Sequence, residues 1–373
     1  MNAISIVILI FSVLGAVDYV IGNKIGIARE FERAFSLFAP MALTMLGMLV
    51  LAPAVGVWLA PLFDGFYRAF GIDPSIIPAS LLANDMGGMT LALSVCKDPA
   101  IGAYNAFVTS SMMGCLISFT LPFSLGLVKR EQHNSLFLGI LCGIATIPVG
   151  CFVSGLVCGI SLSSLLLSLL PLILLGLLVG LALAFLRRVC IRCFAVLGTL
   201  MKIISAAGLA LAIFTLLTGV EICPHFDSLE NAALICVRAC VTLSGALPLM
   251  ALLTRLLHRP LGWLGGKVGI NATAAATLLG TLVTNAVTFG VMDRMDRRGA
   301  VLNSAFAVSA AFALGSHLAF TMAYDPAYLA PMIVGKLISG VAAVALALLV
   351  TRGDAYREKP HTPAKTAEGE DLL

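Results

Sequence analysis

The stretch SLLANDMGGM carries polar chemistry into an apolar part of the chain. Asn84, Asp85 and the glycine pair Gly87 and Gly88 interrupt an apolar run over residues 75–96. An ionisable side chain at membrane depth is costly, so it usually serves a function and faces the bundle interior or a water-filled cavity. Glycines beside it expose backbone groups that a binding cavity uses and lipid does not tolerate. The stretch therefore predicts one half of a substrate site in a membrane transporter.

Asn84 and Asp85 form a first polar tip. Thr284 and Asn285 form a second polar tip, at the corresponding position of the run TLLGTLVTNAVTF. Together the two tips offer a carboxylate, two amides and a hydroxyl, which suit a small cation that also carries a hydrogen-bonding group. The structural alternative is that Asp85 caps a half-helix and the amides satisfy freed backbone groups. We favour the site, because both halves present polar tips.

The run NSAFAVSAAFALGSHLAF is rich in small residues, which let helices approach closely. We expect most of it, including Ser309 and Ser316, to serve packing, although both serines are able to line a cavity. His317 is the exception: it can bind substrate, relay a proton or bond a neighbouring helix, and these alternatives stay open. The predicted substrate-binding residues are Asn84, Asp85, Met86, Gly87, Thr284, Asn285, Ser309 and His317.

The composition predicts that these residues belong to a polytopic helical membrane protein. Of 373 residues, 60% are hydrophobic and 11% are charged, and the mean hydropathy is +1.04. A soluble domain carries roughly 25% charged residues. The net charge of +4 does not argue for nucleic acid, because the basic residues cluster in short loops. No Lys or Arg precedes Lys24, so we expect a first spanning helix with its N-terminus outside, rather than a signal peptide.

The distribution of basic residues indicates which apolar runs cross the membrane, because cytoplasmic loops carry an excess of Lys and Arg. Most runs match the roughly 20 residues of one crossing; they fall at about 3–22, 39–60, 75–96, 101–127, 135–158, 162–186, 196–220, 232–253, 270–290, 300–323 and 327–351. If all eleven cross, eleven basic residues lie inside and ten outside. If runs 75–96 and 270–290 are re-entrant hairpins, nineteen lie inside and only Arg68 and Lys97 outside. The predicted fold class is all-α, with about nine crossing helices and two re-entrant hairpins.

An internal repeat supports the pairing of the hairpins. Identities recur at a spacing of 198 or 199 residues, namely Gly47 with Gly245, Gly71-Ile72 with Gly269-Ile270, Leu81 with Leu279, Ala106-Phe107 with Ala305-Phe306, and Ser110 with Ser309. We predict one transmembrane domain over 1–351, with repeat one at about 1–160, a linker helix at 162–186 and repeat two at about 196–351. Five crossings separate the equivalent first helices, so repeat two is inverted, as in many secondary transporters. A disordered cytosolic tail is predicted over 352–373.

Three further charged residues lie inside apolar runs. Asp18 and Lys336 are expected near the cytosolic ends of their helices, where they can snorkel or pair, and Arg238 about two turns into its helix. We interpret all three as structural. The sequence has no cluster of metal-ligand type, no Walker loop and no GxSxG elbow, so it predicts no metal, no cofactor and no enzyme.

Four segments carry a family resemblance: LLANDMGGM (81–89), GIATIPVG (143–150), MDRRGAVLNSAFAVSAAFALGSHLAF (295–320) and PMIVGKLISG (331–340). They resemble the bacterial ethanolamine-utilisation transporter family over nearly the whole chain. The resemblance implies an inner-membrane permease for ethanolamine, with Asp85 as the countercharge. Ethanolamine is mostly an ammonium at neutral pH, like a lysine head. The implied partners are this small molecule and the lipid bilayer, without nucleic acid, and a homo-oligomer is left open.

Two places depart from the family pattern. The family has an acidic residue before the histidine, as GDHLGF, where this chain has Ser316 in GSHLAF, and it has NNIPMF where this chain has TNAVTF. Fewer acidic groups imply a weaker preference for a cation, or a divergent member that takes a related amine or amino alcohol. The competing functions are a non-transporting membrane sensor or scaffold, and an intramembrane enzyme with Asp85 and His317 as its acid–base pair.

Overall fold

The chain folds entirely into helices and loops over the described residues. The computed structural model describes residues 3–353 and Tyr356, so the predicted tail at 352–373 lies mostly outside them. Eight helical stretches are long and apolar enough to cross a membrane: Ala3–Val20, Ala28–Trp58, Pro99–Leu127, Arg130–Val157, Leu162–Phe185, Arg192–Thr218, Leu229–Leu257 and Pro326–Val350. The prediction of an all-α, polytopic membrane protein is confirmed.

The first half of the chain alternates long helices with short, interrupted ones. Its elements are α1 (Ala3–Val20), α2 (Ala28–Ser36), α3 (Phe38–Met41), η1 (Ala42–Leu46), α4 (Gly47–Trp58), α5 (Ala60–Phe70), α6 (Ile76–Leu81), η2 (Asn84–Met86), α7 (Gly88–Val95), α8 (Pro99–Tyr104), η3 (Asn105–Gly114), η4 (Leu116–Thr120), α9 (Leu121–Leu127), η5 (Arg130–Gln132) and α10 (His133–Val157). The π-helical turns η1, η3 and η4 lie within longer helices, a placement that is frequent at functional sites.

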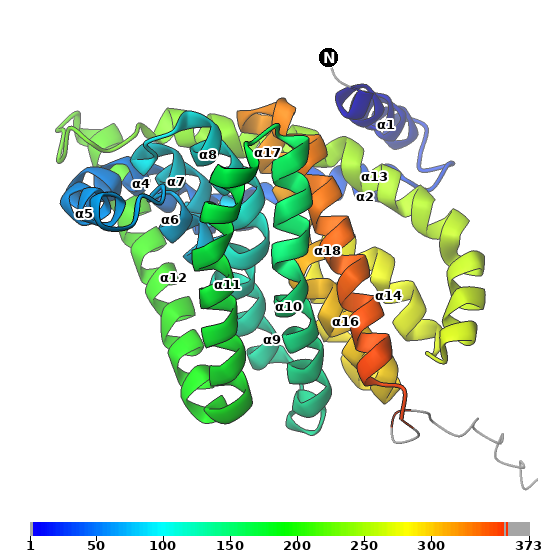
Figure 1. Cartoon of the computed structure of the whole chain (residues 1–373). Coiled ribbons are helices and arrows are strands. Elements are labelled where there is room, and N and C mark those ends of the chain that lie inside the picture. Colours follow the sequence, from blue (N-terminus) through cyan, green and yellow to red (C-terminus); the bar gives the residue numbers. More distant parts are fainter. Residues whose placement is uncertain (1–2, 354–355, 357–373) are drawn as a thin grey trace, which may run out of the picture.

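The second half contains the longest helices of the described chain. Its elements are α11 (Leu162–Phe185), α12 (Arg187–Thr218), α13 (Leu229–Val268), α14 (Ala272–Val283), α15 (Asn285–Gly290), η6 (Met292–Arg294), α16 (Arg297–Ala310), α17 (Ser316–Tyr324), η7 (Pro326–Tyr328) and α18 (Leu329–Val350). Figure 1 shows α10, α11 and α12 side by side, with α18 beside α10 and α13 passing below α1. Pro248 and Pro260 lie inside α13, where proline bends a helix.

Small residues bring α10, α16 and α18 into close contact. A Cβ on Gly139 would lie 2.4 Å from the Val301 carbonyl oxygen, and a Cβ on Gly150 would lie 2.4 Å from the Gly335 carbonyl oxygen. Every residue of α16 after its first is buried. The predicted close packing of the small-residue run is therefore confirmed for its α16 part.

The apolar run at 75–96 is two half-helices whose outer ends are tied together. α6 ends before an extended Leu82, and α7 begins after Gly87, which has a positive φ of 87° that favours glycine. At the outer ends, the Asp73 carboxylate accepts hydrogen bonds from the backbone N–H of Ser75 at 2.9 Å and of Lys97 and Asp98 at 2.8 Å. The first and last residues of the segment therefore lie close together.

The run at 270–290 has the same construction. Thr284 is extended, with φ −159° and ψ 137°, and separates α14 from α15. At the outer ends, the backbone N–H of Asn271 donates to Asp296 Oδ1 at 2.8 Å, and the Asn271 side-chain amide donates to the Arg294 carbonyl at 2.9 Å. The first and last residues of this segment also lie close together.

The residues that tie the two segments correspond by sequence spacing. Asp73 and Asn271 are 198 residues apart, and so are Asp98 and Asp296, which cap the helices that follow each segment. The helices that precede the segments end at Gly71 and Gly269, with φ of 65° and 72°. Glycine is the usual residue for this left-handed cap. The spacing of 198 is thus reflected in matching local structure.

The run at 300–323, predicted as one crossing helix, is broken, and that prediction is wrong. α16 ends at Ala310 and α17 begins at Ser316, with Phe312 at a φ of 63° between them. The backbone N–H groups of Phe312 and Leu314 donate to carbonyls of α14 at 3.2 and 2.8 Å. A Cβ on Gly315 would lie 2.1 Å from the Val283 carbonyl oxygen, so only glycine fits there. Because α14 satisfies the freed backbone groups, the break needs no polar side chain.

Candidate substrate-binding site

The three helix breaks meet at one cavity of about 370 Å³. Its wall includes Asp85 from the first break, Thr284 from the second, and Ser316 and His317 from the third. Side chains of α2, η1 and α13 complete it, and Arg33 of α2, with 53% of its side chain exposed, lies at the solvent side. Much of the remaining wall is apolar. A mainly apolar cavity with a few convergent polar groups is typical of small-molecule sites.

Asp85 and His317 face each other across the cavity wall. His317 Nε2 lies 3.8 Å from Asp85 Oδ1, and the two side chains are 1% and 11% exposed. Ser316 lines the same cavity as this carboxylate. The distance from Asp85 to His317 is longer than a hydrogen bond, so the carboxylate keeps capacity to bind another donor.

Lys336 lies on the far side of His317, and the expectation that it snorkels near a helix end is wrong, whereas the expectation that it pairs is consistent with its contacts. Its ammonium Nζ lies 3.1 Å from His317 Nδ1 and donates to the backbone carbonyl of Ser111 in η3. The side chain is only 1% exposed, so it does not snorkel. An ammonium has donors and no acceptor, so Nδ1 accepts and the imidazole carries its N–H on Nε2, toward Asp85. The partners of Lys336 lie on other elements, so one sequence does not show which face of α18 carries it.

The predicted site residues divide into a group at the cavity and a group behind it. Asp85, Thr284 and His317 line the cavity and are brought together from three segments. Asn285 lies behind the wall, where its amide donates to Thr120 Oγ1 at 3.1 Å. Ser309 is also buried away from the cavity lining and accepts a hydrogen bond from Ser339 at 2.7 Å, which is a packing contact.

The remaining predicted residues, Asn84, Met86 and Gly87, shape the first break. Gly87 supplies the turn, and a Cβ there would lie 3.0 Å from the methyl group of Met48. Met86 is half-buried beside it. Asn84 is fully buried, and neither atom of its amide has a hydrogen-bond partner among the described residues. An unsatisfied buried polar group costs about 1–3 kcal/mol, so this amide retains capacity to bind a ligand.

Thr321 adds a second unpartnered group on the same side of the site. It lies one helical turn after His317 on α17, which packs against η2. One turn later on the same face, the hydroxyl of Tyr324 lies 3.2 Å from that of Thr90 in α7. Residues at this spacing share a helix face, so Thr321 faces the first break between these two contacts. Its hydroxyl is buried without a partner among the described side chains.

Two aromatic rings, Phe312 and Phe119, complete the wall and were not predicted. Phe312 lies 5.1 Å from the His317 ring, and Phe119 meets Phe312 edge-on at 5.5 Å. Aromatic faces attract cations, including ligand ammonium groups. No signal in one sequence distinguishes these two rings from other phenylalanines in apolar runs.

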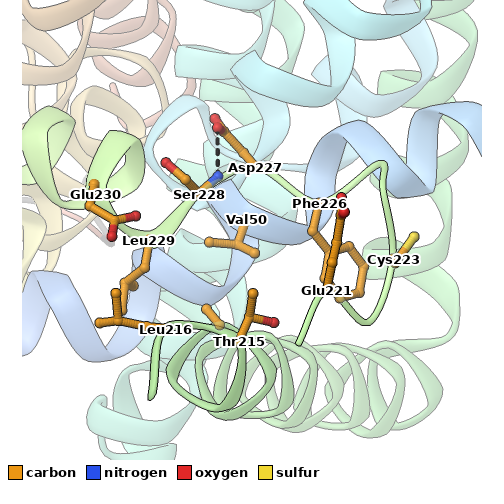
Figure 2. A pocket seen from close by; sticks show the side chains of 11 residues that line it. Val50, Thr215, Leu216, Glu221, Cys223, Phe226, Asp227, Ser228, Leu229 and Glu230 are labelled. Carbon is orange, nitrogen blue, oxygen red and sulfur yellow. Dashed lines mark hydrogen bonds between the residues drawn. The ribbon is translucent and has the colours of Figure 1, made fainter. Parts of the chain in front are cut away.

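A second cavity, of about 390 Å³, lies between α4, α12 and the loop before α13. Figure 2 shows Glu221 and Glu230 on either side of Val50, with Asp227 above them. Asp227 accepts a hydrogen bond from the backbone N–H of Ser228 at 2.7 Å. The lining has three carboxylates and no basic residue. The negative electrostatic potential of three carboxylates raises the local concentration of cations at that surface.

Comparison with known proteins identifies the family. The sequence profile described as "Ethanolamine utilisation protein, EutH" matches residues 1–350. The chain belongs to the EutH family. It is 39% identical over 339 residues, 91% of each chain, to the "Probable ethanolamine permease EutH" of Listeria monocytogenes. It is 36% identical over 400 aligned residues, 96% of this chain and 98% of the relative, to the Escherichia coli protein of the same name.

A further EutH-like relative has a name that states no function. The chain is 34% identical over 363 residues, 97% of this chain and 98% of the relative, to the "Uncharacterized protein YxeR" of Bacillus subtilis. No solved structure matches the chain. The family resemblance predicted from the four sequence segments is confirmed, and EutH relatives that are named as permeases indicate a transporter rather than an enzyme.

Proposed function

We propose that the protein is a permease that imports ethanolamine, or a closely related small amino alcohol or amine, across the bacterial inner membrane by alternating access. The observation that carries the proposal is the Asp85 carboxylate in a cavity where three helix breaks meet. Charge-assisted hydrogen bonds from an ammonium to a carboxylate are about twice as strong as neutral ones. The names of the Listeria and Escherichia relatives support the same substrate.

The neutral groups of the cavity suit the other end of the molecule. The hydroxyls of Thr284 and Ser316 lie in the same wall as Asp85 and can exchange hydrogen bonds with an alcohol. The Phe119 and Phe312 rings offer a face for the ammonium. A water takes about 30 Å³ in the liquid, so about 370 Å³ holds ethanolamine together with several waters. We therefore infer that the substrate binds partly hydrated.

We also propose that the segments 75–96 and 270–290 are re-entrant hairpins in two inverted repeats. The ties at Asp73 and Asn271, which hold the outer ends of each segment together, support this topology. The repeats cover about 1–160 and 196–351, joined by the helix at 162–186. The distribution of basic residues then assigns the N-terminus to the outside, and the C-terminus and the Arg33 side of the cavity to the cytosol.

Uptake of labelled ethanolamine into proteoliposomes tests the proposed function. Wild-type protein should take up the label above the level of protein-free liposomes, and Asp85→Asn should abolish or severely reduce that uptake. Glu131→Gln, which makes the same chemical change on an exposed residue of the loop before α10, should leave it unchanged. Binding without uptake by the wild type would instead support a sensor or scaffold, and conversion of the label would support an enzyme.

A further inference from the structure

The cavity wall contains the Asp85 carboxylate, the buried cation Lys336 lies behind this wall, and the proposed substrate is a second cation. Arg33, a further cation of the wall, is half-exposed and lies 3.5 Å from Glu30, so it takes no part in the buried charge balance. Lys336 and Asp85 lie on opposite sides of the His317 ring, with Nζ 3.1 Å from Nδ1 and Oδ1 3.8 Å from Nε2. Lys336 and His317 are each 1% exposed. Two cations and one anion would leave this buried group of residues with an uncompensated charge.

The surroundings of Lys336 offer no other anion among the described residues. The titratable groups that act on it are the Asp85 carboxylate, the His317 imidazole, and the thiols of Cys115 and Cys151. Thiols in proteins are mostly neutral at neutral pH, and the Ser111 carbonyl is a neutral acceptor. Without substrate, the Lys336 ammonium therefore balances Asp85, and the site is neutral.

A bound ammonium adds one positive charge, and loss of one proton from Lys336 removes one. A buried charge without a partner is strongly unfavourable, whereas a neutral amine is not. His317 supplies the route, because its Nδ1 already accepts from Lys336 and its Nε2–H faces the cavity. The proton leaves Nζ for Nδ1 while the proton on Nε2 leaves for a cavity water. Lys336 is then a neutral amine, His317 is the other neutral tautomer, and the proton count balances.

We propose that Lys336 exchanges its proton for the substrate ammonium through His317, so that the carrier exchanges one ethanolammonium for one proton. This inference rests on the proposed function and adds its coupling. Both forms that cross the membrane are then neutral at the site: Asp85 with protonated Lys336, and Asp85 with bound ethanolammonium and neutral Lys336. Exchange of one cation for another carries no net charge, so transport does not respond to membrane potential.

Wild-type proteoliposomes test this with two separate gradients. An interior more acidic by one pH unit should produce about tenfold accumulation of labelled ethanolamine, because each pH unit is a tenfold ratio of protons. A tenfold potassium gradient with valinomycin, interior negative, should produce no accumulation, although it would concentrate a singly charged cation about tenfold if transport carried net charge. Initial rates of accumulation are compared with those of protein-free liposomes, since neutral ethanolamine also crosses lipid slowly and reaches the same ratio at equilibrium. The opposite pattern, with a response to potential and none to pH, would overturn the exchange.

Substitutions at Lys336 test whether this residue is the exchanging group. Lys336→Met removes the proton, so accumulation should stop following the pH gradient and begin to follow the potassium gradient. Lys336→Arg keeps a cation that does not deprotonate, and should reduce uptake at least about tenfold, as a competing charge does. Lys202→Met, on the exposed face of α12, is the matched control and should behave as wild type.

The outcomes separate the coupling from the transport itself. A Lys336→Met protein that keeps the wild-type response to pH would overturn the role of Lys336. If either variant fails to fold, the two gradients applied to the wild type still decide between exchange and charged transport. Absence of any labelled ethanolamine exchange in the wild type would instead contradict the proposed function, which makes the two failures distinguishable.

Discussion

The two interrupted segments, 75–96 and 270–290, share a frame and differ at the tip. Both follow a helix that ends at a left-handed glycine, and both have outer ends tied by side chains at corresponding positions, Asp73 and Asn271. At the tip, the first segment presents the Asp85 carboxylate and the second presents the Thr284 hydroxyl. We infer that the shared frame positions both tips, while only the first segment recognises charge.

With the proposed function, this difference predicts unequal shares of substrate binding for the two tips. Hydrogen bonds to charged groups are worth about 1.5–3 kcal/mol, and neutral ones about 0.5–1.5 kcal/mol. An ammonium should therefore depend mainly on the first segment and an alcohol mainly on the second. Substitutions at the tips, the ties and the flanking residues test this division, in order of decreasing expected effect.

Asp85→Asn should raise the half-saturating ethanolamine concentration for uptake by about 10- to 100-fold, the range that 1.5–3 kcal/mol implies. Uptake into proteoliposomes over a range of substrate concentrations measures it. The variant should remain monodisperse in detergent and should unfold at the same temperature as the wild type. Near-normal half-saturation at neutral pH would place the countercharge elsewhere.

Removal of a tie should affect stability rather than recognition. Asp73→Ala leaves the backbone N–H groups of Ser75, Lys97 and Asp98 without their carboxylate, and should lower the free energy of unfolding by about 3 kcal/mol. Asp296→Ala loses two backbone donors, of Asn271 and Gly299, and should lower it by about 2 kcal/mol. Thermal unfolding in detergent ranks the two variants. An equal or reversed ranking would show that the number of backbone donors held by each carboxylate does not set its contribution to stability.

Thr284→Val should have a smaller effect on uptake than Asp85→Asn, because it removes a neutral hydroxyl of similar volume. We expect a two- to tenfold rise in half-saturation, which corresponds to about 0.5–1.4 kcal/mol. The hydroxyl also accepts from the Ala286 N–H at 3.2 Å, so unfolding should be measured in parallel. A larger loss than that of Asp85→Asn would reverse the assignment of charge recognition to the first tip.

Ser316→Asp restores the acid that the family pattern has before the histidine. Ser316 lies beside Asp85 in the cavity wall, so a second carboxylate there should favour an ammonium over a neutral alcohol. Competition by ethanolamine and by ethylene glycol against labelled ethanolamine should show a several-fold greater preference for the amine in the variant. An unchanged ratio in a folded variant would exclude position 316 from recognition.

The smallest effect is expected at exposed ion pairs beside the segments. Lys129 lies 2.8 Å from Asp293 after the second segment, and Lys97 pairs with Asp64 beside the first. The hydrogen bond from Lys129 holds the pKa of the Asp293 carboxyl below its ordinary value. A lowered pKa contributes stability that is fully present above the ordinary value, near pH 4, and is lost as pH falls through the lowered value. Lys129→Met should therefore change thermal stability slightly at pH 7 and less at pH 3.

The polar tips could be predicted because a polar side chain inside an apolar run can be recognised from a single sequence. Asp85, Thr284 and His317 were predicted in this way and line the cavity. The break at 311–315 was missed because it is built from apolar residues and glycine, and its backbone groups are satisfied by α14, which is distant in sequence. The burial of Lys336 was not predicted for a related reason, since its partners lie on other helices.

Equilibrium binding of labelled ethanolamine to the purified protein at neutral pH tests most directly whether Asp85 recognises the ammonium. We expect saturable binding to the wild type that unlabelled ethanolamine displaces, and binding weakened at least about tenfold in Asp85→Asn, as loss of a charge-assisted bond implies. Thr284→Val should retain most of the affinity. Equal affinity in wild type and Asp85→Asn, with both proteins folded, would contradict the central claim that the first tip binds the cation.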